Sequence, residues 1–136
     1  MLEVWKDIPN YEGFYQVSNL GNVKSMQRTK KHSYNSIAQL KEKMLRPQNT
    51  NGYLFVRLSK NNEIKRYLVH RLVALTFIPN PNDYLEVNHI DENSLNNNVE
   101  NLEWCSHKYN INYGTGNERR SKTEIKTKRG DYFVHW

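Results

Sequence analysis

The stretch Val87-Asn88-His89-Ile90-Asp91 decides the fold of this chain, together with two asparagines that follow it. Asn101 comes twelve residues after His89, and Asn110 comes nine residues later. A strand with Asn88 and His89, a polar loop, a short strand at 101–104 and a helix beginning near Ser106 would form a hairpin packed against a helix. That arrangement brings His89 close to Asn110. An imidazole facing oxygen ligands suits metal-assisted phosphodiester hydrolysis, which needs a base for water and a hard cation for the developing charge.

The composition indicates a small polar protein. With 136 residues the chain can form one domain with a real core, or a small catalytic unit with an appended binding arm, but not two large domains. The mean hydropathy is −0.91. The longest apolar stretch, around Leu72–Leu75, is interrupted well short of the roughly 20 residues that a membrane helix needs. The first residues lack a basic region followed by an apolar one, so we expect neither a secretory signal nor a membrane partner.

Cysteine content and charge narrow the chemistry further. The single cysteine, Cys105, excludes an internal disulfide and a zinc site built from cysteine pairs. We expect it to be a small buried residue beside Trp104 and not a nucleophile. A net charge of +6 and a pI near 9.4 favour a polyanionic partner.

The first third of the chain shows short strands and then a basic segment. Residues 13–17 and 22–25 flank the turn residues Ser18-Asn19-Leu20-Gly21, which predicts two short strands. Residues 27–48 are basic and polar without a clear period. We interpret this segment as a loop or linker that can hold an irregular strand and can become ordered on a polyanion.

The middle of the chain predicts a hairpin and a helix. Residues 52–58 alternate strictly between two faces, a turn follows at 60–63, and residues 64–68 return. Apolar residues then recur at helical spacing from Val69 to Phe77, until Pro79 and Pro81 end the helix. This helix is expected to cover the hairpin and to brace the site that follows. Beyond Gly116 the chain is expected to form an extended basic arm.

Two segments resemble one known family. Residues 3–25, from Glu3-Val4-Trp5-Lys6-Asp7 to Asn22-Val23-Lys24-Ser25, resemble the N-terminal motif of phage and bacterial homing endonucleases, some of them borne by introns. Residues 69–110 are similar to the HNH nuclease domain of the same family. The resemblance implies an α+β fold of small antiparallel hairpins with a ββα-metal core and extended arms. It divides the chain into an N-terminal DNA-binding motif with basic linker (1–48), the nuclease domain with its preceding hairpin and brace helix (49–116), and a basic tail (117–136).

The resemblance also implies roles for the site residues. His89 would be the general base that activates water, and Asn101 the central asparagine that bridges the loop and orients the histidine. Asn110 would bind a divalent ion, Mg²⁺ or Mn²⁺, through its side-chain oxygen. The second metal ligand would be Asn88, at a position where relatives often carry aspartate. A neutral amide binds a hard cation less strongly than a carboxylate, so we expect weaker metal affinity, or recruitment of Asp91 or the scissile phosphate.

Arg71 and His70 open the brace helix, and two interpretations of them stay open. Arg71 can stabilise the transition state from beside the scissile phosphate, or both side chains can belong to a solvated helix start. We assign Arg71 to the catalytic group and His70 to the DNA-binding group. Other basic side chains are expected to contact phosphates, against the alternative of an ordinary solubilising surface. These are Arg28, Lys30, Lys31, Lys41, Lys43, Arg46, Arg57, Lys65 and Arg66.

These observations favour a site-specific, metal-dependent DNA endonuclease of the homing type. It is expected to act as a monomer on double-stranded DNA in the cytoplasm of a phage-infected or bacterial host cell. The alternative is a catalytically weakened or silent DNA-binding protein that retains the fold, and Asn88 is the residue that keeps this alternative open. A nuclease acting on RNA also fits the charge, although the chain has no RNA-recognition signature.

Overall fold

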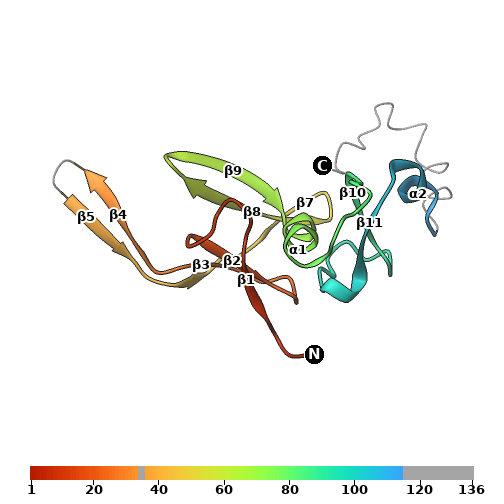
Figure 1. The fold of residues 1–136 in the computed structure, drawn as a ribbon, viewed down its shortest axis with the longest axis horizontal. Helices are drawn as coiled ribbons and strands as arrows, with labels where there is room; N and C mark the ends of the chain where they lie inside the picture. The colour runs from red at the N-terminus through yellow and green to blue at the C-terminus, as the bar shows by residue number, and fades with distance from the viewer. Residues whose placement is uncertain (34–35, 115–136) are drawn as a thin grey trace.

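The computed structural model describes residues 1–33 and 36–114, without the side chains of residues 31–33 and 36. The predictions for the tail 117–136 and for the side chain of Lys31 lie outside this range. The strands form a four-stranded sheet in the order β1-β2-β3-β6, a three-stranded sheet in the order β7-β8-β9, and two separate hairpins, β4-β5 and β10-β11 (Figure 1). No helix within the described residues is long and apolar enough to cross a membrane. The elements are β1 (Trp5–Asp7), β2 (Tyr15–Ser18), β3 (Val23–Ser25), β4 (Arg28–Ser33), β5 (Ser36–Leu40), β6 (Lys43–Met44), β7 (Gln48–Thr50), β8 (Tyr53–Lys60), β9 (Glu63–Leu68), α1 (Val69–Phe77), β10 (Glu86–His89), the 3-10 turn η1 (Val99–Asn101), β11 (Leu102–Cys105) and α2 (His107–Asn112).

Helix α1 lies at the centre of the molecule and confirms the predicted brace. Its residues Val69, Leu72, Val73 and Ala74 are at most 1% exposed. Elements of the four-stranded sheet, the β8-β9 hairpin and the β10-β11 hairpin all contact the helix. The helix ends at Phe77, two residues before Pro79, because proline cannot continue the hydrogen-bonding pattern. One apolar core is therefore shared by segments from both halves of the chain.

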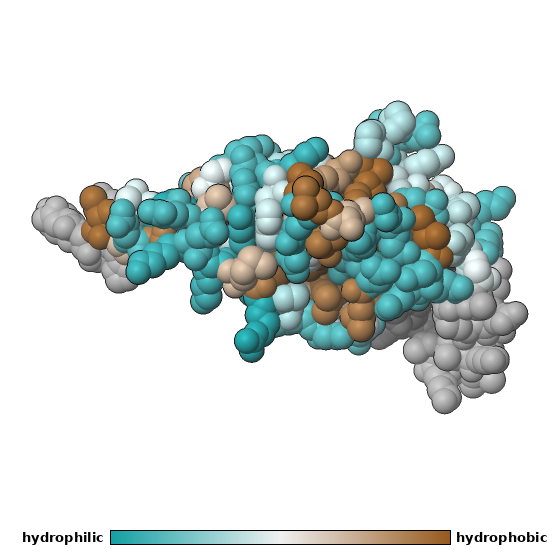
Figure 2. All heavy atoms as spheres, turned by 90° about the horizontal axis from the view of Figure 1, so that it is seen from below, coloured by the Kyte–Doolittle hydropathy of each residue, from teal (hydrophilic) through white to brown (hydrophobic). Residues whose placement is uncertain are grey.

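The β4-β5 hairpin projects from this body as a narrow arm (Figure 1). The sequence predicted a loop or linker here, and that prediction was wrong. None of the described side chains of β4 and β5 is fully buried, so the pairing requires no apolar residue at every second position and leaves no period of two in the sequence. Even the apolar side chain of Ile37 on β5 is 73% exposed. Figure 2 shows the arm as narrow and largely hydrophilic.

The β10-β11 hairpin and helix α2 form the predicted ββα unit. The strands are antiparallel, and their register pairs Val87 with Trp104 and His89 with Leu102. Ser106 caps α2, because its side-chain oxygen accepts a hydrogen bond of 3.1 Å from the backbone N–H of Tyr109. The structure thus confirms the α+β class with a strand-rich body and few helices.

The N-terminal sheet touches the loop between β10 and β11 directly. The backbone N–H of Val99 donates a 2.8 Å hydrogen bond to the carbonyl oxygen of Asn19. Gly21 has a φ of +92°, and a Cβ built on it would lie 2.9 Å from the Cβ of Asn97. Only glycine fits this approach without moving the loop. The turn at residues 18–22 therefore packs against the loop between β10 and β11 and supports it.

We predict that Gly21→Ala destabilises the protein more than Gly13→Ala does. Both glycines have positive φ, but a Cβ on Gly13 meets no atom within 4 Å. The backbone strain of about 1–2 kcal/mol is common to both variants, whereas the clash with Asn97 belongs to Gly21→Ala alone. Urea denaturation of the two variants measures the difference. Equal losses of unfolding free energy would show that the turn at Gly21 does not support the loop.

Candidate active site

His89 ends strand β10 and its imidazole is buried, with 7% of the residue exposed. Its Nε2 lies 2.9 Å from Oδ1 of Asn97. An amide oxygen only accepts hydrogen bonds, so Nε2 carries the proton and Nδ1 keeps its lone pair. No residue in the described part of the chain hydrogen-bonds Nδ1. The ring also contacts two others, His70 at 4.8 Å and Tyr53 at 6.1 Å between ring centroids.

Burial lowers the pKa of His89 below its ordinary value of 6.5. The hydrogen bond to Asn97 and the charge of Asp91 act in the opposite direction and do not cancel the effect of burial. The imidazole is therefore neutral at pH 7. A neutral imidazole whose Nε2 is hydrogen-bonded to Asn97 and whose Nδ1 keeps its lone pair can accept a proton at Nδ1.

Asn101 organises the loop that follows His89. Its side-chain oxygen accepts a hydrogen bond from the backbone N–H of Asp91, and its Nδ2 donates to Oδ1 of Asp91 and to the carbonyl oxygen of Asn96, each at 2.9 Å. The pKa of the Asp91 carboxyl is lowered, chiefly by the hydrogen bond from the Asn96 side chain. Asp91 thus closes the loop as an acceptor. Asn101 fixes both ends of the loop that presents Asn97 to His89.

Asn88 lies on the other face of the hairpin, and Asn110 lies on α2, from which it reaches Glu86 on that face. Asn88 is 6% exposed, and its Nδ2 donates a 2.7 Å hydrogen bond to Glu103. The Nδ2 of Asn110 donates a 2.9 Å hydrogen bond to Glu86. Neither Oδ1 accepts a hydrogen bond from a residue that the structure describes. Two amide oxygens thus remain for another partner, with two carboxylates beside them.

This donor set fits a hard divalent cation. Mg²⁺ and Mn²⁺ prefer oxygen ligands, and both amide oxygens and carboxylates supply them. Within residues 1–33 and 36–114 no group of three His, Cys, Asp or Glu side chains is arranged to hold a metal. The amide oxygens of Asn88 and Asn110, beside the carboxylates of Glu103 and Glu86, are groups that could hold such a cation.

Cys105, and His70 and Arg71 in the first turn of α1, are held within the fold. Cys105 is buried, as expected, and burial raises the pKa of its thiol to about 12, so it stays protonated. His70 is buried against Tyr53 and His89 and does not face solvent. Arg71 donates a 2.6 Å hydrogen bond to the carbonyl oxygen of Leu85, and its guanidinium lies over the ring of Trp104. Partial burial lowers the pKa of Arg71.

The basic residues named from the sequence occupy two regions. Arg28 is half-buried at the root of the arm, where it bonds the carbonyl oxygens of Phe14 and Met26 and stacks on the rings of Phe14 and Tyr15. Arg57 and Arg66 lie over the ring of Phe55 on the β8-β9 hairpin, and Lys65 forms an ion pair with Glu63. The other described members are exposed: Lys30, Lys41, Lys43 and Arg46.

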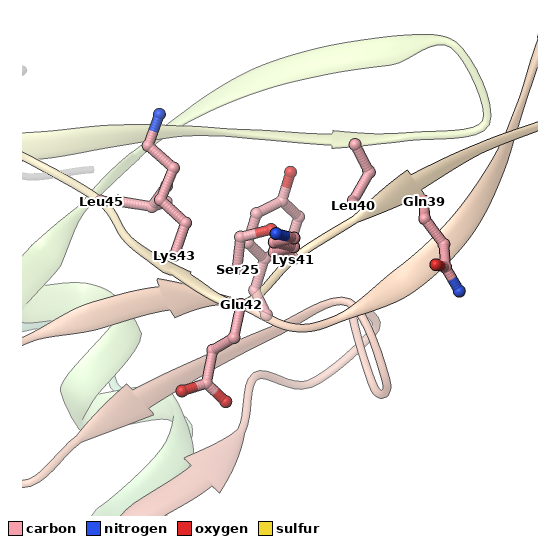
Figure 3. A pocket seen from close by; sticks show the side chains of 8 residues that line it. Ser25, Gln39, Leu40, Lys41, Glu42, Lys43 and Leu45 are labelled. Carbon is pink, nitrogen blue, oxygen red and sulfur yellow. The ribbon is translucent and has the colours of Figure 1, made fainter.

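An open pocket lies at the root of the arm, lined by Ser25, Gln39, Lys41 and neighbouring residues (Figure 3). It includes none of the predicted catalytic or metal-binding residues. The pocket is therefore separate from the site at His89.

Three side chains of the site could not be identified from the sequence: Asn97, Glu86 and Glu103. Asn97 lies in the run Asn96-Asn97-Asn98, where the sequence does not distinguish one asparagine from the next. The two glutamates become visible only through the strand register, which pairs Asn88 with Glu103 and Glu86 with Cys105. Alternation along the two strands then puts both carboxylates on the face of Asn88.

Comparison with known families gives two matches in order along the chain. Residues 3–59 match the NUMOD4 motif, and residues 67–111 match the HNH endonuclease family. The first match ends in β8, and the second begins at the end of β9 and covers α1 and the ββα unit. The two matched segments meet in the shared core around α1.

Individual relatives agree with these matches. An uncharacterized HNH endonuclease of Acanthamoeba polyphaga mimivirus is 54% identical over 70 residues, which is 51% of this chain and 21% of the relative. The DNA endonuclease I-HmuI of Bacillus phage SP01 is 39% identical over 109 residues, which is 79% of this chain and 55% of that protein. The chain thus spans about a fifth to about half of the length of these relatives.

A solved structure of the HNH homing endonuclease I-HmuI, from work on its DNA binding and cleavage, resembles this chain with a TM-score of 0.65 and 32% sequence identity. The match covers 96% of this chain and 66% of that chain. With two family motifs in order and a fold shared over nearly its whole length, the chain belongs to the HNH endonucleases that carry a NUMOD4 motif.

Proposed function

We propose that this protein is a site-specific, divalent-metal-dependent endonuclease that cuts double-stranded DNA as a monomer in the cytoplasm of its host cell. The observation that carries the proposal is the state of His89, a neutral imidazole with Nε2 held by Asn97 and Nδ1 open. The relative I-HmuI is a DNA endonuclease, and its DNA binding and cleavage are the subject of the matching structure. These facts support DNA as the substrate.

In the proposed reaction, His89 accepts a proton from the attacking water at Nδ1. The hydrogen bond from Nε2 to Asn97 keeps the ring in the tautomer that this step needs and stabilises the imidazolium that forms. A bound divalent cation supplies positive charge that stabilises the phosphate and the leaving oxygen. Asn88 and Asn110 would hold that cation through their amide oxygens.

The two faces of the hairpin restrict where the scissile phosphate can lie. Side chains alternate along β10, so Asn88 and His89 leave the strand on opposite faces. His89 is the last residue of the strand, and the chain turns directly after it. A phosphate at this strand end is reachable from both faces. We therefore place the scissile group at the end of β10 and not over either face.

The β8-β9 hairpin offers a second contact for the DNA backbone. Arg57 and Arg66 stand directly opposite each other in the register, which places two like charges side by side. Neither arginine joins an ion pair among the described residues. Both guanidinium groups lie over Phe55, with Cζ at 5.3 Å and 4.0 Å from the ring centroid. A phosphate between them would relieve the repulsion and accept hydrogen bonds from both.

A catalytically silent DNA-binding protein is the second candidate. Asn88 favours it, because an amide contributes no negative charge to a metal site. The nuclease and the catalytically silent protein would share every feature of the DNA-binding surface and would differ only in whether they cleave DNA.

Cleavage of supercoiled plasmid that carries candidate target DNA, in Mg²⁺ or Mn²⁺, separates the two candidates. We expect relaxed or linear product from the unmodified protein and a rate about 10²- to 10⁴-fold lower from His89→Ala, because the variant lacks the general base. DNA affinity, measured by fluorescence anisotropy, should be retained in the variant. Binding without any cleavage by the unmodified protein would establish the silent alternative.

The pH dependence of single-turnover cleavage tests the role of His89 independently. The base must be neutral, and its pKa is lowered, so the rate should fall only as the pH drops below 6.5. Asn97→Asp places a carboxylate beside Nε2, which raises the pKa of His89 and should move this acid limb to higher pH. Asn93→Asp is the matched control, since it adds the same charge to an exposed position of the same loop. If the acid limb of the pH–rate profile lies at the same pH in both variants, His89 is not the titrating base.

The arginine pair is tested by the salt dependence of DNA binding. We expect Arg66→Gln to weaken binding on every sequence and to reduce the slope of log affinity against log salt by about 1, because one phosphate contact is lost. Lys65→Gln is the comparison, since Lys65 lies on the other face of the same strand and already pairs with Glu63 at 3.1 Å. A larger effect of Lys65→Gln would place the DNA on the opposite face of the hairpin.

A further inference from the structure

Each amide that would bind the metal is tied to a carboxylate. Glu103 accepts a 2.7 Å hydrogen bond from Nδ2 of Asn88, and Glu86 accepts a 2.9 Å hydrogen bond from Nδ2 of Asn110. The two pairs lie on one face of the β10-β11 hairpin. Asn88 and Glu103 are directly opposite each other in the register, and Glu86 lies two residues before Asn88.

A carboxylate partner determines which atom of an amide faces away from it. An ionised carboxylate only accepts hydrogen bonds, so it binds the NH₂ group of asparagine and not the oxygen. The amide oxygen must then point the other way. A flipped amide would bring two oxygens into contact with each other and would present an NH₂ group to the cation. Both contacts are repulsive.

The carboxylates are themselves held by the first turns of α2. The hydroxyl of Tyr109 donates a 3.2 Å hydrogen bond to the same oxygen of Glu103 that binds Asn88. Nδ1 of His107 lies 2.6 Å from the second oxygen of Glu86. Because Ser106 caps the N-terminus of α2, these two side chains have fixed positions relative to the hairpin. The orientation of the amides is thus built into the packing of helix against strands.

We propose that Glu103 and Glu86 are positioning residues that orient the amide oxygens of Asn88 and Asn110 toward the divalent cation. Residues that hydrogen-bond a metal ligand commonly fix its orientation and change metal affinity when they are removed. This inference rests on the proposed function, because it requires that the two asparagines bind the metal. It also explains how a site with neutral amide ligands retains nearby negative charge.

The test is Mn²⁺ affinity measured by isothermal titration calorimetry on the full chain without DNA. We expect Glu103→Gln and Glu86→Gln each to weaken Mn²⁺ binding about 10-fold or more, because glutamine also donates and no longer distinguishes the two ends of the asparagine amide. Glu100→Gln is the matched control, since it removes the same charge from an exposed position of the same domain. Its Mn²⁺ affinity should equal that of the unmodified protein.

A double-mutant cycle separates positioning from a purely electrostatic effect. Aspartate has two equivalent oxygens and needs no orientation, so Glu103→Gln should weaken Mn²⁺ binding far less in an Asn88→Asp background. An equal loss in both backgrounds overturns the positioning role, because direct ligation or charge alone would persist. Side-chain ¹⁵N NMR gives a second measurement without metal: the NH₂ signals of Asn88 should lose exchange protection in Glu103→Gln.

The outcomes distinguish this inference from the function on which it rests. If the unmodified protein binds no Mn²⁺ without DNA, the two asparagines do not hold the cation by themselves and the positioning role is overturned. Plasmid cleavage in Mn²⁺ then shows separately whether the metal-dependent mechanism stands. If it binds Mn²⁺ and neither glutamine variant changes the affinity, the positioning role alone is wrong. Thermal unfolding of each variant shows whether a loss of affinity is a loss of fold. A variant that binds weakly while its melting temperature is unchanged supports the inference.

Discussion

The burial of helix α1 is the constraint on which the rest of this structure depends. The N-terminal sheet, the β8-β9 hairpin and the β10-β11 hairpin each contribute only a few apolar side chains to the core, and all three contact helix α1. Segments of this size cannot bury enough apolar surface alone. They therefore fold around one helix, and this places the turn at Gly21 against the loop that carries Asn97.

Elements that bury one face could be predicted from the sequence, whereas the arm could not. The strand β8 and the helix α1 were predicted because burial imposes a period of 2 or of 3.6 on the apolar residues. The strands β4 and β5 carry no such period, since none of their described side chains is fully buried. Their pairing depends on the backbone, which leaves little trace in the side chains.

The same distinction applies within the candidate site. His89, Asn101 and Asn110 could be named from the sequence because their spacing fits one hairpin and one helix. The partners Asn97 and Glu103 could not, because spacing says nothing about which loop amide reaches a ring or which residue lies across a strand. Those partners follow from the loop closed by Asn101 and from the register of the two strands.

The register of β10 and β11 links the core to the proposed metal chemistry. Val87 and Leu102 are only 6% and 5% exposed, and their burial fixes which face of each strand points toward the core. A slip of one residue would move them off the apolar core and would move Glu103 to the face of His89, away from Asn88. Apolar packing on one face therefore determines which carboxylate meets which amide on the other. In the proposed arrangement the negative charge that Asn88 lacks is carried one strand away, by Glu103, and the core itself keeps it there.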